Sequence, residues 1–265
     1  MELLKYPLVD THAHICDPVF DTDRDAVLER AQREGVAAVV AVGETLDDAQ
    51  RNLELARIHP NLRPAAGLYP TILDLGQAKE MVDFIHSHRD RLAAIGEVGL
   101  DFWAIKEDEQ KALQREIFKI FIDLSRELDL PLNVHSRSAG RHAVALLLEK
   151  NAVRVQMHAF DGKASAALPA VEAGYFFSVP PSIVRSRQKQ KLVRHLPLSC
   201  LLVETDSPYL APKPFRGKRN EPGYTVHTAE VGAEVFGLDY ADFAARTQEN
   251  FDRLFWKAAQ YEAAA

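Results

Sequence analysis

The sequence predicts a single (β/α)8 TIM barrel, an α/β fold, and three observations lead to this class. Eight short apolar runs alternate with longer segments of helical periodicity. The runs are nearly continuous in apolar residues, as in strands that are buried on both faces of a parallel sheet. The 265 residues can bury one large core, although the length alone also permits two small domains. We therefore expect one barrel domain over residues 1–265.

The predicted strands are rich in Val, Leu and Ile. They lie at residues 8–10, 36–42, 62–67, 92–96, 130–134, 153–157, 175–179 and 200–203. Eight β-then-α units in a row favour closure into a barrel. An open doubly wound sheet is the alternative, but no glycine-rich phosphate loop follows an early strand.

Helical periodicity lies between the predicted strands. The first helix carries the apolar stripe Val27, Leu28 and Ala31, and in residues 107–129 apolar residues recur with steps of three and four. Shorter helices are expected at residues 47–58, 77–88, 141–150, 164–173 and 187–195. Two more are expected after Val226, and the last carries on one face Phe243, Thr247, Phe251 and Leu254.

Composition is typical of a globular protein that does not cross a membrane. No stretch approaches the roughly 20 apolar residues of a membrane helix, and the N-terminus has no secretory signal. Two cysteines, Cys16 and Cys200, indicate buried thiols rather than a disulfide framework. We expect a cytoplasmic protein, with a monomer favoured. The net charge is −6, yet residues 173–203 contain no Asp or Glu and five Lys or Arg. That stretch predicts either a surface for polyanions or a solvated helix face.

Metal-binding residue types follow five of the predicted strands directly. They stand in Asp10-Thr11-His12-Ala13-His14, in Gly96-Glu97-Val98-Gly99-Leu100-Asp101, at His135, at His158 and in Glu204-Thr205-Asp206. The C-terminal ends of barrel strands meet at one mouth, where barrel enzymes place their active sites. A His-x-His pair or a single histidine is a weak signal, but an apolar barrel does not gather several imidazoles and carboxylates unless something pairs them. Divalent cations would do so.

The spacing of these residues predicts two metal ions. Glu97 comes from a strand between the two histidine groups, so it can bridge. One ion would take His12, His14, Glu97 and Asp206, and the other Glu97, His135 and His158. Mixed imidazole and carboxylate ligands suit Mg, Mn, Zn, Co, Ni or Fe.

At these residues the sequence resembles the TatD family of metal-dependent nucleases, within the amidohydrolase superfamily. The resemblance covers nearly the whole chain, and residues 134–140, 158–162 and 175–192 are most similar to the branch called TatD domain-containing family member three. The motifs are those above together with His135-Ser136-Arg137, His158-Ala159-Phe160-Asp161-Gly162, Glu204-Thr205-Asp206-Ser207-Pro208 and Arg219-Asn220-Glu221-Pro222. The resemblance implies a barrel with a two-metal centre, the same six ligands, and DNA hydrolysis, often 3′-to-5′ on single strands.

One position departs from the family pattern. The family usually has a histidine in a Gly-x-His-Pro segment after the third strand, and this chain reads Gly67-Leu68-Tyr69-Pro70. A phenol can hydrogen-bond a phosphate but is a poor ligand for Mg or Zn at neutral pH. Tyr69 therefore puts a third metal in doubt and is a candidate substrate contact.

The mechanism expected from these residues is attack by a metal-activated water, with Asp206 as general base and Glu97 as bridge. The candidate contacts to a nucleic-acid substrate are Tyr69, Arg137, Arg185, Arg187, Arg216 and Asn220. Arg137 could instead pair with an acidic neighbour, and Asn220 could fix Asp206. Phe102 and Trp103 could stack on a base or cap the barrel core. DNA single strands or ends are the expected partner.

Two other functions stay open at this stage. A hydrolase of a small phosphoester or amide would share the fold and the metals, so the fold does not decide. A non-catalytic binding protein with a decayed site is supported only by Tyr69, since all six expected ligands are present.

Overall fold

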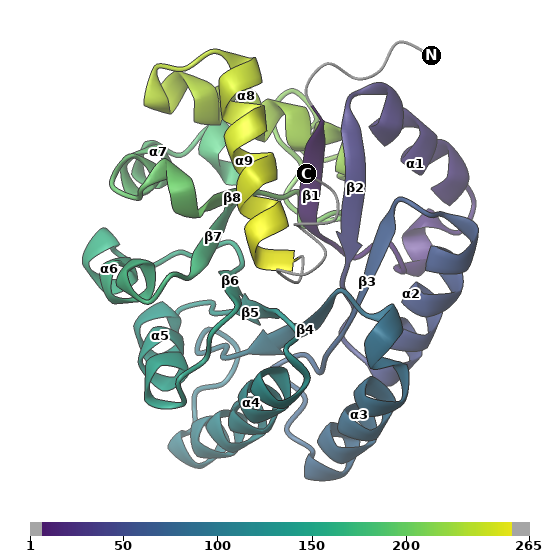
Figure 1. The fold of residues 1–265 in the computed structure, drawn as a ribbon, viewed down its shortest axis with the longest axis vertical. Helices are drawn as coiled ribbons and strands as arrows, with labels where there is room; N and C mark the ends of the chain where they lie inside the picture. Colours follow the sequence, from purple (N-terminus) through teal and green to yellow (C-terminus); the bar gives the residue numbers. More distant parts are fainter. Residues whose placement is uncertain (1–6, 256–265) are drawn as a thin grey trace.

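Eight parallel strands lie side by side in sequence order, with helices around them (Figure 1). This computed structural model describes residues 7–255, so the two ends of the predicted domain, 1–6 and 256–265, lie outside the described residues. The strands are β1 Leu8–Ala13, β2 Val36–Ala41, β3 Leu62–Ala66, β4 Ala94–Gly99, β5 Leu132–His135, β6 Val155–Met157, β7 Phe176–Val179 and β8 Leu201–Val203. The predicted barrel is confirmed.

The helices follow the strands as the periodicity predicts. Their bounds are α1 Arg24–Arg33, α2 Leu46–Ile58, α3 Leu75–His88, α4 Asp108–Leu128, α5 Gly140–Glu149, α6 Ala164–Glu172, α7 Arg187–Arg194, α8 Thr225–Phe236 and α9 Tyr240–Phe255. Local signals mark several ends. Thr45 caps α2 through a reciprocal bond with Asp48, and Gly237 ends α8 in a left-handed conformation.

The ring between the first and last strands is closed by the segment that follows β8. The amide of Asp206 donates to the carbonyl of His12 at 2.9 Å, and the amide of His14 donates to that of Ser207 at 2.7 Å. The hydroxyl of Thr11 also donates to the carbonyl of Val203 at 2.9 Å. Closure therefore places Asp206 directly beside His12 of β1 and His14 just beyond it.

Two strands extend past the apolar runs that predicted them. β1 continues through His12 to Ala13, and β4 continues through Glu97 to Gly99. The apolar pattern stops at the first polar residue, whereas the backbone hydrogen bonds of the ladder continue beneath polar side chains. The candidate metal ligands of these strands are therefore held by the sheet itself.

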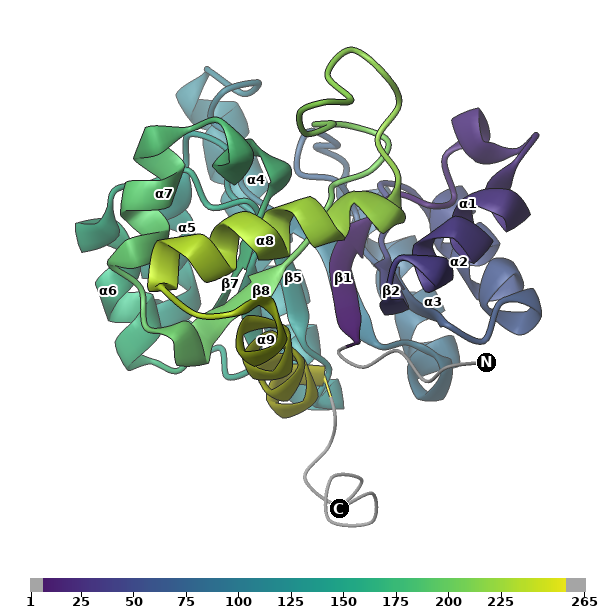
Figure 2. The ribbon, with the colours of Figure 1, turned by 90° about the horizontal axis from the view of Figure 1, so that it is seen from above.

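Helix α9 covers the N-terminal end of the barrel. It lies at the lower end of the barrel in Figure 2, while the green loop from β8 to α8 projects from the opposite end. Phe251 and Leu254 of α9 join a buried cluster of inward-facing strand residues, Val9, Ala38, Val40, Val42, Ala65, Ala94, Phe176 and Leu202. The barrel is thus plugged with apolar side chains at one end, and its polar interior residues lie toward the other.

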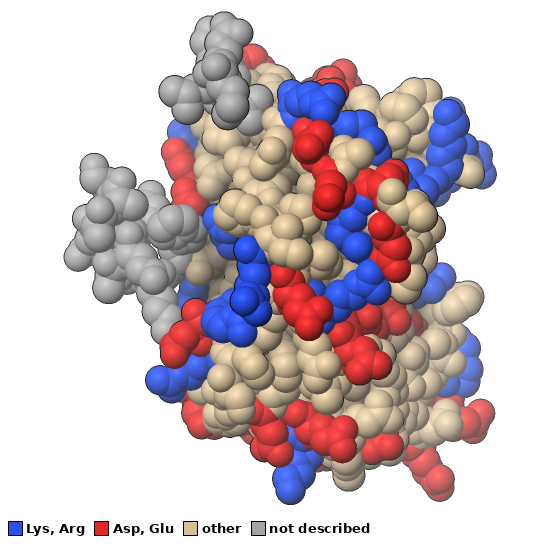
Figure 3. All heavy atoms as spheres, turned by 90° about the vertical axis from the view of Figure 1, so that its right-hand side faces the viewer, with Lys and Arg blue, Asp and Glu red and all other residues tan. Residues whose placement is uncertain are grey.

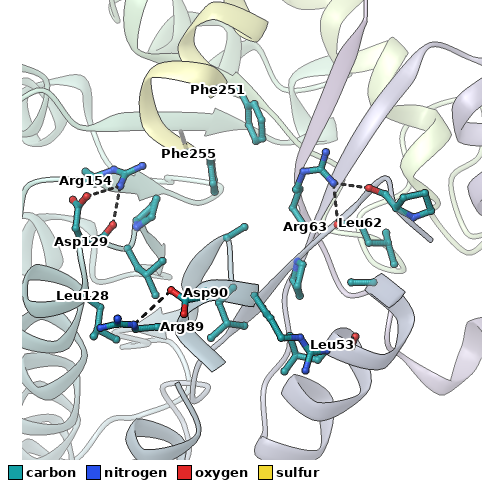
Figure 4. A pocket seen from close by; sticks show the side chains of 18 of the residues that line it. Leu53, Leu62, Arg63, Arg89, Asp90, Leu128, Asp129, Arg154, Phe251 and Phe255 are labelled. Atoms are coloured by element: carbon teal, nitrogen blue, oxygen red, sulfur yellow. Dashed lines mark hydrogen bonds and ion pairs between the residues drawn. The ribbon is translucent and has the colours of Figure 1, made fainter. Parts of the chain in front are cut away.

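A cavity opens at this N-terminal end of the barrel, beside α9. It has a volume of about 1140 Å³, and Arg63 and Arg154 lie on opposite sides of it (Figure 4). We call it the arginine cavity after the five arginines that line it, Arg57, Arg63, Arg89, Arg91 and Arg154.

Charges on the outer surface are mixed. On the face formed by α1, α2 and α3, Asp and Glu side chains are interspersed with Lys and Arg (Figure 3). Some of them form ion pairs, as Arg33 does with Glu29 at 3.1 Å on α1. None of the helices within residues 7–255 combines the length and the apolar composition needed to cross a bilayer.

Candidate metal centre

The structure brings all six predicted ligands together at the C-terminal end of the barrel. His12 lies in β1 and His14 one residue beyond it, Glu97 lies in β4, and His135 ends β5. His158 and Asp206 follow β6 and β8. Their side chains are buried, and that of Asp206 is the most accessible at 15% exposure, against 2% for Glu97. Six groups from five strands therefore share one small volume.

Four donor atoms form the first half of this centre. The Nε2 atoms of His12 and His14 lie 3.3 Å apart, and they lie 3.8 and 3.5 Å from Oε2 of Glu97. They lie 3.7 and 3.5 Å from Oδ1 of Asp206. Four ligands at about 2.1 Å from one tetrahedral ion would be separated by about 3.4 Å. The observed spacing fits one divalent cation between these atoms.

The other oxygen of Glu97 faces the second half. Oε1 of Glu97 lies 2.6 Å from Nδ1 of His135 and 3.9 Å from Nε2 of His158. These three side chains also group as potential metal donors, as His12, His14 and Glu97 do. Each carboxylate oxygen of Glu97 is thus shared with a different pair of histidines.

A second layer of side chains determines which nitrogen each histidine presents. Oδ1 of Asn133 lies 2.8 Å from Nδ1 of His12, which leaves Nε2 facing the centre. Oδ2 of Asp101 lies 3.1 Å from Nε2 of His135, and Oε2 of Glu204 lies 2.9 Å from Nδ1 of His158. Such partners orient metal-bound imidazoles and increase their basicity.

Sequence reasoning did not assign these three partners. Asp101 and Glu204 stood in the quoted motifs without a role. A signal for Asn133 existed, because it lies two residues before His135 on β5 and so faces the same side of the strand.

Glu204 places a buried carboxyl group next to this centre. The hydroxyl of Ser178 hydrogen-bonds Oε2 of Glu204, and Nε2 of Gln156 donates to that hydroxyl at 2.9 Å. Oε1 of Glu204 is buried without a hydrogen-bond partner within the described residues. An unsatisfied carboxylate oxygen beside stacked imidazoles, those of His12 and His158 at 3.5 Å between ring centroids, favours a positively charged occupant.

The pKa values of Glu97, His135 and His158 also indicate that this centre stabilises positive charge. Burial opposes the charged form of Glu97, yet His135, His12 and His158 hold its pKa well below the usual range. Burial lowers the pKa of a histidine, but at His158 the neighbouring Glu204 outweighs this effect and raises the pKa to about 10. At His135, Glu97 and Asp101 raise the pKa to about 9 in the same way. Carboxylates that stabilise protonated imidazoles this strongly would also stabilise a divalent cation.

His12 and Asp206 differ in their surroundings. Burial and the neighbouring His158 lower the pKa of His12 to about 4, so His12 stays neutral and able to coordinate. Burial would raise the pKa of Asp206, but its hydrogen bond with His14 and the charge of His158 lower it. Asp206 is therefore an ionised carboxylate at neutral pH.

A cavity of about 550 Å³ opens above this centre. Five of the six predicted ligands line it, all except His12. The other lining residues come from several loops, among them Glu44, Tyr69, Ser136, Arg137, Asp161 and Tyr209. Glu44, which follows β2, was missed because a single glutamate after an apolar run carries no distinctive spacing. Burial raises the pKa of Glu44 and that of Tyr69, whose ring centroid lies 5.1 Å from that of His135.

The predicted substrate contacts fall into three groups. Tyr69 and Arg137 line the cavity. All three remaining arginines are exposed and lie outside the cavity lining, Arg185 before α7, Arg187 at the start of α7 and Arg216 on the loop that follows β8. Asn220 is fully buried.

The surroundings of Asn220 give it a structural role instead of a substrate contact. Its Nδ2 donates to the carbonyls of Thr205 and Tyr209 at 2.7 and 2.6 Å, on either side of Asp206. It therefore shapes the backbone of the loop that carries Asp206, and no bond from it to the Asp206 side chain is present. Arg219 beside it pairs with Asp23 at the start of α1, and Glu221 pairs with Arg30 in its last turn, which ties this loop to α1.

Known proteins share the sequence pattern and the fold of this chain. A family model described as TatD related DNase matches residues 9–256. The sequence is 44% identical to deoxyribonuclease TATDN3 of Homo sapiens, over 94% of this chain and 95% of that protein. It is 36% identical to an uncharacterized metal-dependent hydrolase, YabD, of Bacillus subtilis, over 94% and 98% of the two chains. The structure resembles the crystal structure of YJJV, a TatD homolog from Escherichia coli, with a TM-score of 0.87 and 28% identity over 94% and 97%.

Proposed function

Because the chain belongs to the family of TatD-related DNases, we propose that it is a hydrolase that cleaves phosphodiester bonds of single-stranded DNA at a two-metal centre. The predicted family membership is confirmed, and the homologues are named deoxyribonucleases and metal-dependent hydrolases. The number of ions, the strand preference and the direction of digestion belong to the proposal.

One observation carries the two-metal proposal, namely the position of Glu97 between two groups of histidines. Its Oε2 lies 3.5 Å from Nε2 of His14, and its Oε1 lies 2.6 Å from Nδ1 of His135. A carboxylate that bridges two ions about 3.5–4 Å apart is a recurring arrangement in phosphoester hydrolysis. His12, His14 and Asp206 would hold one ion, and His135 and His158 the other.

Bound divalent cations would lower the pKa of a water molecule to near neutrality and offset the charge that develops on the phosphate. The other steps are assigned to side chains. Asp206 is ionised and is the more accessible carboxylate of the centre, so it can accept the proton of the attacking water. Glu97 is almost fully enclosed and positions the two halves instead.

Tyr69 would contact the substrate phosphate. Burial raises its pKa, so the hydroxyl keeps its proton and can donate a hydrogen bond to a non-bridging oxygen. Arg137, at the rim of the same cavity, can donate to the next phosphate. The exposed Arg185, Arg187 and Arg216 would attract the DNA backbone through longer-range charge.

The first experiment compares the wild type with Asp206→Ala on a single-stranded oligonucleotide with Mg²⁺ or Mn²⁺. We expect cleavage by the wild type, no measurable cleavage by the variant, and about two equivalents of divalent metal in the wild type by elemental analysis. Oligonucleotides labelled at either end report direction, and loss of the 3′ label first would support 3′-to-5′ digestion. Full cleavage by Asp206→Ala would contradict the assignment of the base.

A hydrolase of small phosphoesters or amides is the alternative on the same scaffold. The relevant comparison is the catalytic efficiency on an oligonucleotide against that on p-nitrophenyl phosphate and on an N-acetyl amino acid. A higher efficiency on either small substrate would favour the alternative.

We also propose a cytoplasmic monomer. Cys16 and Cys200 are both buried and free, as suits a reducing compartment. Light scattering of the purified protein tests the oligomeric state, and fractionation of cells tests the location.

A further inference from the structure

The two most exposed aromatic side chains among residues 7–255 stand at the same end of the barrel. Trp103 is 56% exposed and Tyr209 is 49% exposed. An indole or phenol that is about half exposed does not fill a core, and its open face can take up a ligand. Trp103 therefore does not cap the barrel core, which was one of its two predicted roles.

These two residues lie on opposite sides of the metal centre. Trp103 follows β4 and Tyr209 follows β8, four strands apart in a ring of eight. Tyr209 lines the cavity, and its ring centroid lies 5.8 Å from that of His14. The guanidinium carbon of Arg137, which also lines the cavity, lies 3.7 Å from the ring centroid of Trp103. One aromatic surface thus stands at each side of the mouth.

Trp103 is fixed relative to the centre through Asp101. Oδ1 of Asp101 accepts from the amide of Trp103 at 2.8 Å, while Oδ2 of the same carboxylate lies 3.1 Å from Nε2 of His135. The amide of Phe102 also donates to the carbonyl of Arg137 at 3.0 Å. One carboxylate therefore orients a candidate metal ligand and the turn that presents the indole.

Tyr209 is fixed in a similar way on the other side. Its amide donates to the carbonyl of Asp206 at 2.8 Å, and its carbonyl accepts from Nδ2 of Asn220 at 2.6 Å. These bonds fix the backbone that presents the phenol beside the candidate general base.

We propose that Trp103 and Tyr209 are two nucleobase-stacking platforms that hold the nucleotides on either side of the scissile phosphate. This inference rests on the proposed function and names the substrate as a strand with unpaired bases. Stacking on an aromatic face does not depend on sequence, since every base has a π-face. Bases within a duplex are already stacked on their neighbours and cannot reach two platforms on opposite sides of one phosphate.

Arg137 completes the platform on the β4 side. Its guanidinium covers one face of the indole, and the exposed fraction of Trp103 shows that much of the remaining surface is open. No ion pair joins Arg137 to an acidic side chain in the described part of the chain, so its donors remain available for a phosphate oxygen. The indole would receive a base while the guanidinium receives the adjoining phosphate.

The test uses single-stranded oligonucleotides in which the two thymines that flank the cleaved bond are replaced by dihydrothymine, which is not planar. The wild type is expected to cleave the planar substrate with a catalytic efficiency about tenfold higher. Trp103→Leu and Tyr209→Leu are each expected to reduce this preference and to raise KM for the planar substrate more than they lower kcat. Trp103→Phe, which keeps an aromatic face, should retain most of it. Ile58→Ala, at an exposed apolar residue of α2, is the control and should behave as the wild type.

A binding measurement avoids turnover altogether. The chain has two tryptophans, Trp103 and Trp256, so a Trp256→Phe background reports on Trp103 alone. With EDTA present, a single-stranded oligonucleotide should quench this fluorescence more than an equal concentration of duplex.

The outcomes separate this inference from the proposed function. A wild type that cleaves no DNA would contradict the proposed function. A wild type that cleaves DNA, with both leucine variants keeping its full preference for planar bases and with no quenching of Trp103, would overturn the platforms alone.

Discussion

Each end of the barrel has a cavity lined by charged residues, and the sign of the charge differs between them. Arginines predominate at the N-terminal end, and carboxylates with imidazoles at the C-terminal end. The arginine cavity is the larger, at about 1140 Å³ against about 550 Å³ for the cavity above the metal centre. Three of its five guanidinium groups donate to backbone carbonyls. Arg154 donates to the carbonyl of Leu254 at 2.9 and 2.6 Å, Arg63 to that of Pro60 at 2.6 Å and Arg91 to that of Leu53 at 3.3 Å.

The chain direction explains this difference. Helices of a βα barrel end near the N-terminal ends of the strands, so carbonyls and the negative ends of helix dipoles gather there. Arginines at that end have backbone partners close by. At the other end, buried carboxylates and imidazoles face one another in groups that could hold a metal ion. Convergence of buried charge, rather than the size of a hollow, therefore identifies the candidate active site.

The largest effect on metal binding and DNA cleavage is expected from a substitution of Glu97 at the C-terminal end. Glu97→Gln removes the one charge shared by both halves of the metal centre while keeping the shape of the side chain. We expect loss of bound divalent metal by elemental analysis and a fall in DNA cleavage of about a thousandfold or more. Retention of two metals with normal turnover would show that Glu97 does not bridge.

The second layer of the centre should give a smaller effect. Glu204→Gln keeps an acceptor for Nδ1 of His158 but removes the buried charge, so metal affinity should fall about 10- to 100-fold. Competition with a chelator measures this affinity. The control is Glu230→Gln on α8, where an exposed glutamate pairs with His227 at 3.1 Å and no change in affinity is expected. If both variants had the same metal affinity, Glu204 would not contribute to metal binding.

Matched arginine substitutions compare the two ends directly. Arg185→Gln with Arg187→Gln removes two charges near the mouth, and Arg57→Gln with Arg91→Gln removes two from the arginine cavity. The first pair should weaken binding of single-stranded DNA several-fold and reduce the slope of log affinity against log salt by about 1.4. The second pair should leave both quantities at wild-type values. If both pairs reduced the slope alike, the binding surface would not be confined to the mouth.

The smallest effect is expected in stability at the N-terminal end. Arg154→Gln removes donors to the last turn of α9 and should lower the free energy of unfolding by about 1 kcal/mol, measured by urea denaturation. Cleavage per folded molecule should not change. Arg33→Gln, which breaks only the exposed pair with Glu29, should lower stability less. A large loss of cleavage in folded Arg154→Gln would contradict a purely structural role for this end.

The fold class was predictable because its signals are local. Near-continuous apolar runs and helical stripes predicted each strand and helix to within a few residues, since burial on both faces of a parallel sheet imposes that composition. The convergence of the candidate ligands was predictable for a related reason, as side chains that follow parallel strands directly must meet at one end of the barrel.

Roles that depend on distant partners were not predictable. Asn220 was expected among the substrate contacts, but it is buried and donates to the carbonyls of Thr205 and Tyr209. Lys189, one of the basic residues of the stretch 173–203, donates to the carbonyl of Phe160 in the loop after β6 instead of lying on a solvated face. The partner of Lys189 lies on another loop, and the partners of Asn220 lie 15 and 11 residues before it in the same loop. Nothing in the sequence around either residue indicates these contacts.

The sequence by itself determined that this chain closes into a barrel, and that its imidazoles and carboxylates stand at the strand ends where they must converge. Hydrophobic periodicity and strand direction suffice for that. Only the tertiary structure decided which oxygen of Glu97 faces which histidines, that Asp101 holds both His135 and the turn of Trp103, and that three arginines of the other end donate to backbone carbonyls. Those outcomes depend on distances of a few ångströms between residues far apart in the chain, which no local pattern encodes.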